Sequence, residues 1–168
     1  MTQFYAQPYD ISATGFYFET VDEYTQKAAK AKNGYGQKVE EFEIQFIDGE
    51  MIDVQTCEAL GINQGNIQKI MELLDEWDDD QKRAIIIAVG GCYSHFDVET
   101  DDPDDIDIDL YEMDTIRELA EHFVDEGLFG EIPPQLIFYI DYDAIARDLS
   151  VDYTETTIAG QCLIYALR

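Results

Sequence analysis

The stretch from Asp97 to Asp109 constrains the fold more than any other part of this chain. Eight of its thirteen residues are acidic and none is Lys or Arg. A run of like charge is typical of a disordered tail, yet this one changes into a strict alternation of Asp with Ile or Leu at residues 105–110. Period-two alternation predicts a half-buried strand. We therefore expect a strand that carries Asp105, Asp107 and Asp109 outward in one row.

The composition indicates a folded but unusually acidic protein. The chain has 168 residues, 46% of them hydrophobic, and a net charge of −27. This apolar fraction is ordinary for a globular protein and too high for an acidic disordered one. A compact chain of this length has a diameter of roughly 40 Å, so its charge amounts to about one per 1.5 Å, against about one per 1.7 Å for duplex DNA.

Charge and apolar patterning exclude several classes of protein. The basic residues are too few and too scattered for nucleic-acid binding. There is no run of about 18 apolar residues and no basic-then-apolar start, so we expect a soluble, cytoplasmic protein without a membrane partner. Cys57, Cys92 and Cys162 are odd in number and have no paired spacing. This pattern favours buried free thiols over a disulfide framework or a zinc site.

The pattern of apolar residues predicts an α+β fold with antiparallel sheets and a central helical part, in three modules at residues 1–60, 61–103 and 104–168. In the first module we expect strands at residues 4–6, 15–18 and 39–47. The pattern Thr20-Val-Asp-Glu23 predicts the start of a helix that runs to about Lys32. After the Asp48-Gly49 turn, residues 51–54 are expected to form a short return strand.

The second module, residues 61–103, is expected to consist mainly of helices, and the third, residues 104–168, is expected to begin with the acidic strand. A helix at 67–77 ends in acids, where its dipole disfavours them, which weakly favours a functional reason for their presence. A second helix, capped by Asp79 or Asp80, is expected to reach Val89, with a buried strand at 84–89 as the alternative. After the acidic strand we expect a helix capped by Asp114 and ended by Gly127, short helices at 135–139 and 141–149, and a last strand at 162–167.

Calcium binding and carboxylate catalysis are the first interpretations to weigh for so many acids. An EF-hand loop needs acids at its positions 1, 3 and 5, Gly at 6 and Glu at 12. Counted from Asp105, the sixth and twelfth positions hold Leu110 and Ile116. A catalytic acid needs a pocket that raises its pKa, which outward-facing acids lack, and His95 and His122 are the only histidines. We predict no catalytic residue, no metal site and no cofactor.

The remaining interpretation is that the acids themselves form the binding surface. Asp114, Glu118, Glu121 and Asp125 are spaced to form one stripe on a helix. A helix or strand of this kind carries one charge per about 5.5–6.7 Å, against about 3.4 Å per phosphate of one DNA strand, so several elements must act together. The expected phosphate-mimicking residues are Asp75, Glu76, Asp78, Asp79, Asp80, Asp97, Glu99, Asp101, Asp102, Asp104, Asp105, Asp107, Asp109, Asp114, Glu118, Glu121 and Asp125. The expected partner is a protein whose basic groove normally holds DNA.

The C-terminal third carries a family resemblance. The segment Glu118-Leu-Ala-Glu-His-Phe-Val-Asp-Glu-Gly-Leu-Phe-Gly-Glu-Ile-Pro-Pro-Gln-Leu136, followed by Tyr139-Ile-Asp-Tyr-Asp143 and Ala146-Arg-Asp-Leu149, resembles the ArdA antirestriction proteins of plasmids, transposons and phages. The resemblance implies an elongated, three-part mimic of B-form DNA. Such a protein occupies the DNA-binding groove of type I restriction–modification enzymes and inhibits restriction, while inhibition of modification is left open.

The resemblance also implies a homodimer joined through the segment that contains Gly130-Glu-Ile-Pro133. The expected interface residues are Leu128, Phe129, Gly130, Glu131, Ile132, Pro133, Leu136, Phe138, Tyr139 and Tyr142. The alternative is that these side chains form only the core of the C-terminal module.

Two other interpretations of the acidity stay open. The protein could be an acidic inhibitor or regulator of another DNA-binding protein or phage-defence complex, which competition assays against type I enzymes would separate. The acids could instead serve only solubility in a salt-loving host, in which case ordinary housekeeping proteins of that host would share the excess.

Overall fold

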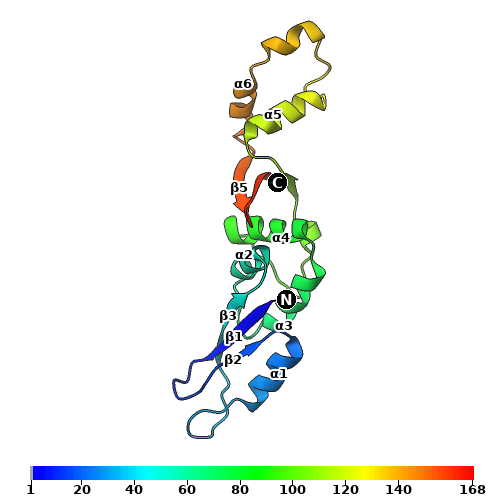
Figure 1. Cartoon of the computed structure of the whole chain (residues 1–168). Helices are drawn as coiled ribbons and strands as arrows, with labels where there is room; N and C mark the ends of the chain where they lie inside the picture. The colour runs from blue at the N-terminus through cyan, green and yellow to red at the C-terminus, as the bar shows by residue number, and fades with distance from the viewer. Residues whose placement is uncertain (1) are drawn as a thin grey trace. The chain divides into compact units, whose positions relative to one another are not determined.

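The computed structural model describes residues 2–168 and has the α+β fold expected from the sequence. Its elements group into two compact units, Met1–Ile106 and Asp107–Arg168, which we call the N-terminal and C-terminal units (Figure 1). The finer division into three modules stays a prediction. No helix among residues 2–168 combines the length and the apolar character needed to cross a membrane.

The N-terminal unit begins with an antiparallel sheet in the order β2-β1-β3. Its elements are β1 (Gln3–Pro8), β2 (Phe16–Phe18), α1 (Val21–Lys30), β3 (Phe42–Asp48), α2 (Met51–Leu60), α3 (Ile67–Glu76), α4 (Asp79–Ile85), the π-helix η1 (Ile86–Gly91) and the 3₁₀ helix η2 (Pro103–Asp105). In the sheet register, Phe4 lies between Phe18 and Phe46. The Thr20 hydroxyl caps α1 as expected, because it accepts a hydrogen bond from the Glu23 N–H.

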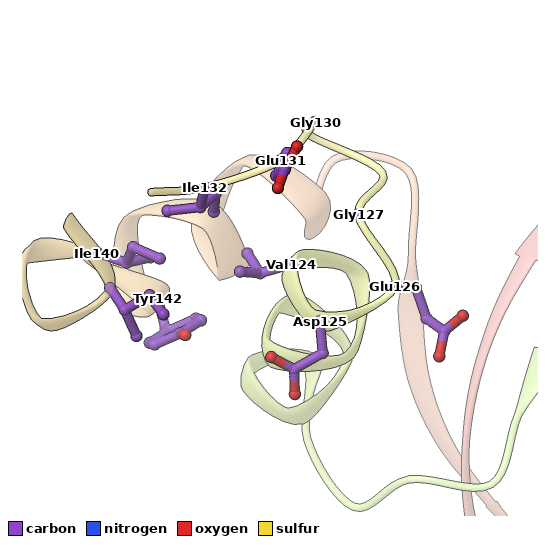
Figure 2. Close-up of a pocket in the computed structure, with 10 residues that line it drawn as sticks. Val124, Asp125, Glu126, Gly127, Gly130, Glu131, Ile132, Ile140 and Tyr142 are labelled. Carbon is purple, nitrogen blue, oxygen red and sulfur yellow. The ribbon is translucent and has the colours of Figure 1, made fainter. Parts of the chain in front are cut away.

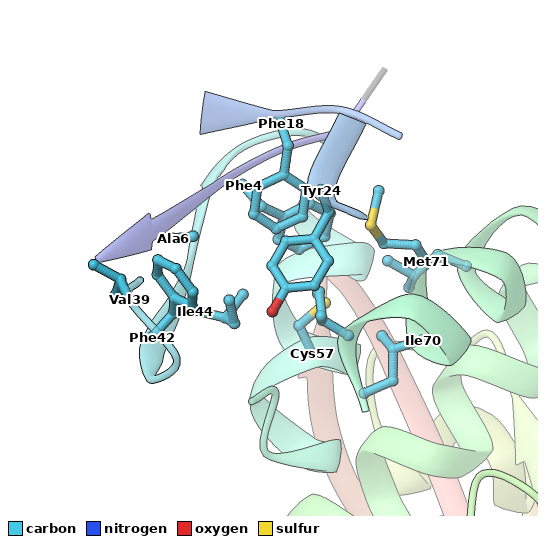
Figure 3. Close-up of a cluster of buried hydrophobic side chains, with 12 residues drawn as sticks. Phe4, Ala6, Phe18, Tyr24, Val39, Phe42, Ile44, Cys57, Ile70 and Met71 are labelled. Atoms are coloured by element: carbon cyan, nitrogen blue, oxygen red, sulfur yellow. The ribbon is translucent and has the colours of Figure 1, made fainter. Parts of the chain in front are cut away.

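Alternation along β1 and β3 turns one face of this sheet into the main core of the unit. Phe4, Ala6, Phe42 and Ile44 are buried on that face, and Tyr24 of α1 packs against it. Figure 3 shows these side chains next to Cys57 of α2 and to Ile70 and Met71 of α3. The sheet therefore positions α2 and α3, which lead the chain to its first group of acids.

The expected return strand at 51–54 is wrong, because these residues open helix α2. Gly49, at φ 155°, turns the chain, and Gly61 ends the helix in the left-handed conformation at φ 64°. Helical spacing buries the adjacent pairs Ile52–Asp53 and Thr56–Cys57, whereas a strand would place only alternate residues inward. A window of four residues contained too few positions to separate the two periods.

The helical interpretation of residues 84–89 is correct, and the strand alternative is wrong. Helix α4 continues without a break into η1, and Ile85, Ile87 and Ala88 are buried along them. The same segment buries Lys82, whose Nζ lies 2.7 Å from Asp53 Oδ1 of α2. This buried ion pair joins α2 to α4.

The C-terminal unit contains a second antiparallel sheet, in the order β4-β6-β5. Its elements are β4 (Ile108–Tyr111), α5 (Ile116–Asp125), the 3₁₀ helix η3 (Pro134–Tyr139), α6 (Tyr142–Leu149), β5 (Thr154–Ile158) and β6 (Gln161–Leu167). Leu119 and Phe123 of α5 pack on Ile164 and Ala166 of β6. Strand β5 was not expected from the sequence.

Candidate functional site

The first group of acids lies where α3 passes into α4. It comprises five exposed residues, Asp75, Glu76, Asp78, Asp79 and Asp80. The Asp78 carboxylate accepts a hydrogen bond from the Gln81 N–H at 2.9 Å, and the Asp78 N–H donates to Gln81 Oε1 at 3.0 Å. This reciprocal capping box satisfies two backbone donors and fixes the turn between the helices.

The position of the cap changes the electrostatic interpretation of this group. The expected cap at Asp79 or Asp80 is wrong, since Asp78 and Gln81 have the spacing that the capping box requires. Asp79 and Asp80 therefore lie in the first turn of α4, where the helix dipole favours acids. Only Asp75 and Glu76 remain at the unfavourable end of α3.

The second group of acids lies on the loop that precedes β4. It comprises six exposed residues, Asp97, Glu99, Asp101, Asp102, Asp104 and Asp105. Backbone groups within the loop fix three of these carboxylates. The Glu99 N–H donates to Asp97 Oδ1 at 3.0 Å, the Asp97 N–H donates to Asp101 Oδ2 at 2.8 Å, and the Asp104 N–H donates to Asp102 Oδ1 at 3.0 Å. The loop is therefore ordered by its own acids, in contrast to a self-repelling tail.

The structure brings these two groups together, although more than fifteen residues separate them along the chain. Gln81 Nε2 donates to Asp104 Oδ1 at 2.8 Å. Trp77 of the first segment and Phe96, which precedes the second group, meet edge to face with ring centroids 6.0 Å apart, and Pro103 within the second group is buried. Both groups thus lie on one apolar support. Gln81 was not an expected site residue, but the Asp-x-x-Gln spacing of the capping box is a signal that could have found it.

The expected strand at residues 105–110 is correct only in its second half. Pro103 opens η2 and Asp102 caps it, so Asp105 belongs to a helical turn, and β4 starts at Ile108. Local capping therefore prevails over the alternating pattern, and Asp109 is the only one of the three acids within the strand. Asp109 accepts a hydrogen bond from Arg168 Nε at 2.9 Å, and this contact raises the pKa of the arginine. The expected row of Asp105, Asp107 and Asp109 along one strand is therefore wrong.

The acids of α5 form a shorter stripe than expected. The helix is capped by the Thr115 hydroxyl, and the expected cap, Asp114, precedes it and donates its N–H to Glu118 Oε2 at 3.1 Å. Glu121 accepts a hydrogen bond from Arg117 Nε at 3.2 Å. The same guanidinium donates to Asp143 of α6 at 2.6 Å, and the hydrogen bonds to Asp143 and then Glu121 raise the Arg117 pKa. One cation therefore offsets part of this stripe, while Asp125 stays exposed.

The segment from Gly127 to Tyr142 displays apolar side chains to solvent. Phe138 is 94% exposed and Tyr139 83% exposed. The other exposed members of the expected interface are Leu128, Phe129, Gly130, Glu131, Pro133 and Leu136, whereas Ile132 and Tyr142 are half-buried. No residue of η3 is buried. The alternative that this segment forms only core is therefore wrong for the exposed members.

A cavity of about 410 Å³ lies between the end of α5 and this segment. In Figure 2 the side chains of Val124, Ile132 and Ile140 point into it from three parts of the chain. Gly127 and Gly130, at φ 76° and 90°, give the chain the turns that lead around it. The exposed apolar segment thus folds back on α5 as an ordered extension.

Among residues 2–168, no group of three or more His, Cys, Asp or Glu side chains is arranged to hold a metal ion. His95 is exposed, and His122 is half-buried with its ring edge to face with Tyr111. The carboxylates of the two acidic groups instead face solvent or accept hydrogen bonds from neighbouring N–H groups.

These features define a strongly acidic α+β protein, several of whose exposed carboxylates are held in place by capping and turn hydrogen bonds. A family model described as Antirestriction protein (ArdA) matches residues 4–162. The chain belongs to this family, which confirms the resemblance found in its C-terminal third. It is therefore an antirestriction protein, of a family that inhibits restriction–modification enzymes. No curated protein matches the chain.

Proposed function

We propose that this antirestriction protein mimics B-form DNA and occupies the DNA-binding groove of a type I restriction–modification enzyme. The observation that carries the proposal is the joining of the two acidic groups through Gln81, Asp104 and the Trp77–Phe96 contact. Eleven exposed acids from two distant segments thereby share one support. Their density can exceed that of a single helix or strand, which alone is too sparse to replace phosphates.

Electrostatic binding of this kind distributes its free energy over many charges. An exposed ion pair contributes about 0.2–1 kcal/mol, so a single change such as Asp107→Asn is expected to weaken binding by less than about fivefold. Four changes on the joined groups are expected to weaken binding by about 1–4 kcal/mol, or roughly fivefold to several-hundredfold.

Competition for DNA tests the proposal. The full chain is titrated into a type I methyltransferase bound to labelled DNA, and DNA release is followed. The test variant combines Glu76→Gln, Asp79→Asn, Glu99→Gln and Asp105→Asn. The control variant removes the same charge from exposed acids outside the expected surface, with Asp22→Asn, Glu40→Gln, Glu41→Gln and Glu58→Gln. Equal losses in the two variants would contradict the assignment of binding to the joined groups, and absence of DNA release by the unmodified chain would overturn the proposal.

The same proposal includes a homodimer joined through residues 127–142. Support comes from the exposure of Phe129, Leu136, Phe138 and Tyr139 on one ordered segment, since exposed apolar patches mark interaction sites. A dimer carries twice the charge of one chain and can fill a longer groove. Sedimentation at several concentrations tests this part, and a monomer at all of them would reject it.

A further inference from the structure

A second cavity, of about 580 Å³, opens within the N-terminal unit between β1, the first turns of α1 and α2, and α3. Ligand-binding pockets typically measure roughly 300–1,000 Å³. One side of this cavity is lined by Phe4, Met71, Leu74 and Trp77, all of them largely buried. Figure 3 shows Phe4 and Met71 where the sheet meets α3. The cavity therefore offers an apolar wall with one indole.

The floor of the cavity carries the ion pair of Asp53 and Lys82. The Asp53 side chain is 10% exposed and the Lys82 side chain 8% exposed, and the Nζ–Oδ1 distance is 2.7 Å. Each charge is therefore compensated by the other within the protein. The floor adds polarity but little net charge to the cavity.

The rim of the cavity is acidic. Glu19, Glu50, Glu72 and Asp75 line it together with the floor pair, and in the described part of the chain Lys82 is its only cationic lining residue. Glu50 precedes α2 without making a side-chain capping bond, so its carboxylate is not committed to that helix. The Glu72 carboxylate lies 3.9 Å from the Lys69 ammonium, measured from Oε2 to Nζ, which is longer than a hydrogen bond. A cation with an apolar body complements such a cavity.

We propose that this cavity receives an arginine side chain from the DNA-binding surface that the protein occupies, an inference that rests on the proposed function. An arginine stem can lie along Met71 and Leu74, as long cationic side chains do on apolar surfaces. Its planar guanidinium stacks on an indole and binds carboxylates with two parallel hydrogen bonds. DNA-binding proteins use arginine to contact phosphates, so the basic groove supplies this side chain. The compact ammonium of lysine lacks both the planar fork and the stacking face.

Trp77 is the only tryptophan of the chain and reports directly on the cavity. N-acetyl-L-arginine amide is titrated into the full chain while the indole ¹H–¹⁵N resonance is followed. N-acetyl-L-citrulline amide, which has a similar shape but no charge, serves as the control ligand. A saturable shift with the arginine compound alone is expected. The absence of saturation, or equal shifts with both compounds, would overturn the proposal.

A variant with Glu50→Gln and Glu72→Gln, two lining acids outside the joined acidic groups, tests the rim. It is expected to weaken binding of the arginine compound by about tenfold or more, because two charged hydrogen-bond acceptors are lost. The control variant, Glu41→Gln with Glu58→Gln, has the same charge but leaves the cavity unchanged, and it is expected to bind like the parent. Circular dichroism and thermal unfolding establish that both variants fold. Equal weakening in the two variants would refute a role for the rim.

The affinity for a type I methyltransferase, measured at one salt concentration, then tests the source of the arginine. The rim variant is expected to lose about tenfold more affinity than the control variant. Equal affinities would overturn the assignment of the occupant to this enzyme. If the unmodified chain does not bind the methyltransferase at all, the proposed function fails, whereas the arginine titration still decides whether the cavity accepts the side chain.

Discussion

Removing Lys82 from its buried pair with Asp53 is expected to destabilise the N-terminal unit strongly. The Lys82→Met change keeps an unbranched apolar stem but leaves the Asp53 carboxylate, with 10% of its side chain exposed, without the ammonium 2.7 Å away. Loss of one partner of a buried pair costs about 3–5 kcal/mol, since the remaining charge stays desolvated. Folded domains are stable by only about 5–15 kcal/mol. The change therefore removes a large share of the total.

Urea unfolding, followed by Trp77 fluorescence, measures this loss. The matched control is Lys69→Met, because the Lys69 ammonium lies 3.9 Å from Glu72 in a largely solvated pair, for which a loss below about 1 kcal/mol is expected. Adding Asp53→Leu to Lys82→Met removes both buried charges and is expected to recover most of the stability. The recovery is incomplete, because Asp53 lies in the first turn of α2, where an acid contributes about 0.3–1 kcal/mol. If Lys82→Met costs no more than Lys69→Met, the desolvation argument is refuted.

Three further predictions concern other parts of the chain. Gln81→Ala removes one half of the capping box and the hydrogen bond to Asp104. It is expected to lower the free energy of unfolding in urea by about 1–2 kcal/mol. An unchanged urea midpoint would contradict the role of Gln81 in joining the two acidic groups. Phe138→Ala is expected to raise the dimer dissociation constant by more than about 100-fold in sedimentation, because about 1.5–3 kcal/mol of burial is lost from each subunit; Val151→Ala is the exposed control. Burial raises the pKa of Cys57 from 9.0 to about 12, so the folded state favours the thiol, and the stability gained from this group is present below pH 9 and is lost as pH rises toward 12. A thiol reagent at pH 8 should therefore label the exposed Cys92 rapidly and Cys57 only on unfolding. Equal labelling rates for the two cysteines would refute this prediction.

Much of the fold was predictable because it follows from local patterns. The apolar alternation of β3 and the helical spacing of α3 and α5 each extend over enough residues to separate a period of two from one near four. The start of α6 also depends on a local signal, because the Asp141 carboxylate accepts a hydrogen bond from the Ala144 N–H three residues later. Helix α2 was missed because its first residues fit both periods.

The remaining features depend on partners that are distant in the sequence. Asp53 looks like a surface acid until Lys82, 29 residues away, is placed against it. Strand β5, with the sequence Thr-Glu-Thr-Thr-Ile, has little apolar alternation and is defined by its pairing with β6. The contact between Gln81 and Asp104 likewise spans 23 residues. The two acidic segments could therefore be identified from the sequence, but their joining could not.

The salt dependence of binding to a type I methyltransferase tests the central proposal most directly. A protein that replaces DNA in a basic groove should lose affinity steeply as salt rises, as protein–DNA complexes do by about 10³–10⁵ between about 50 and 200 mM. We expect a loss of at least about 100-fold over that interval, together with mutually exclusive binding of the chain and DNA. An affinity that stays constant with salt, or a complex that holds the chain and DNA at once, would contradict DNA mimicry.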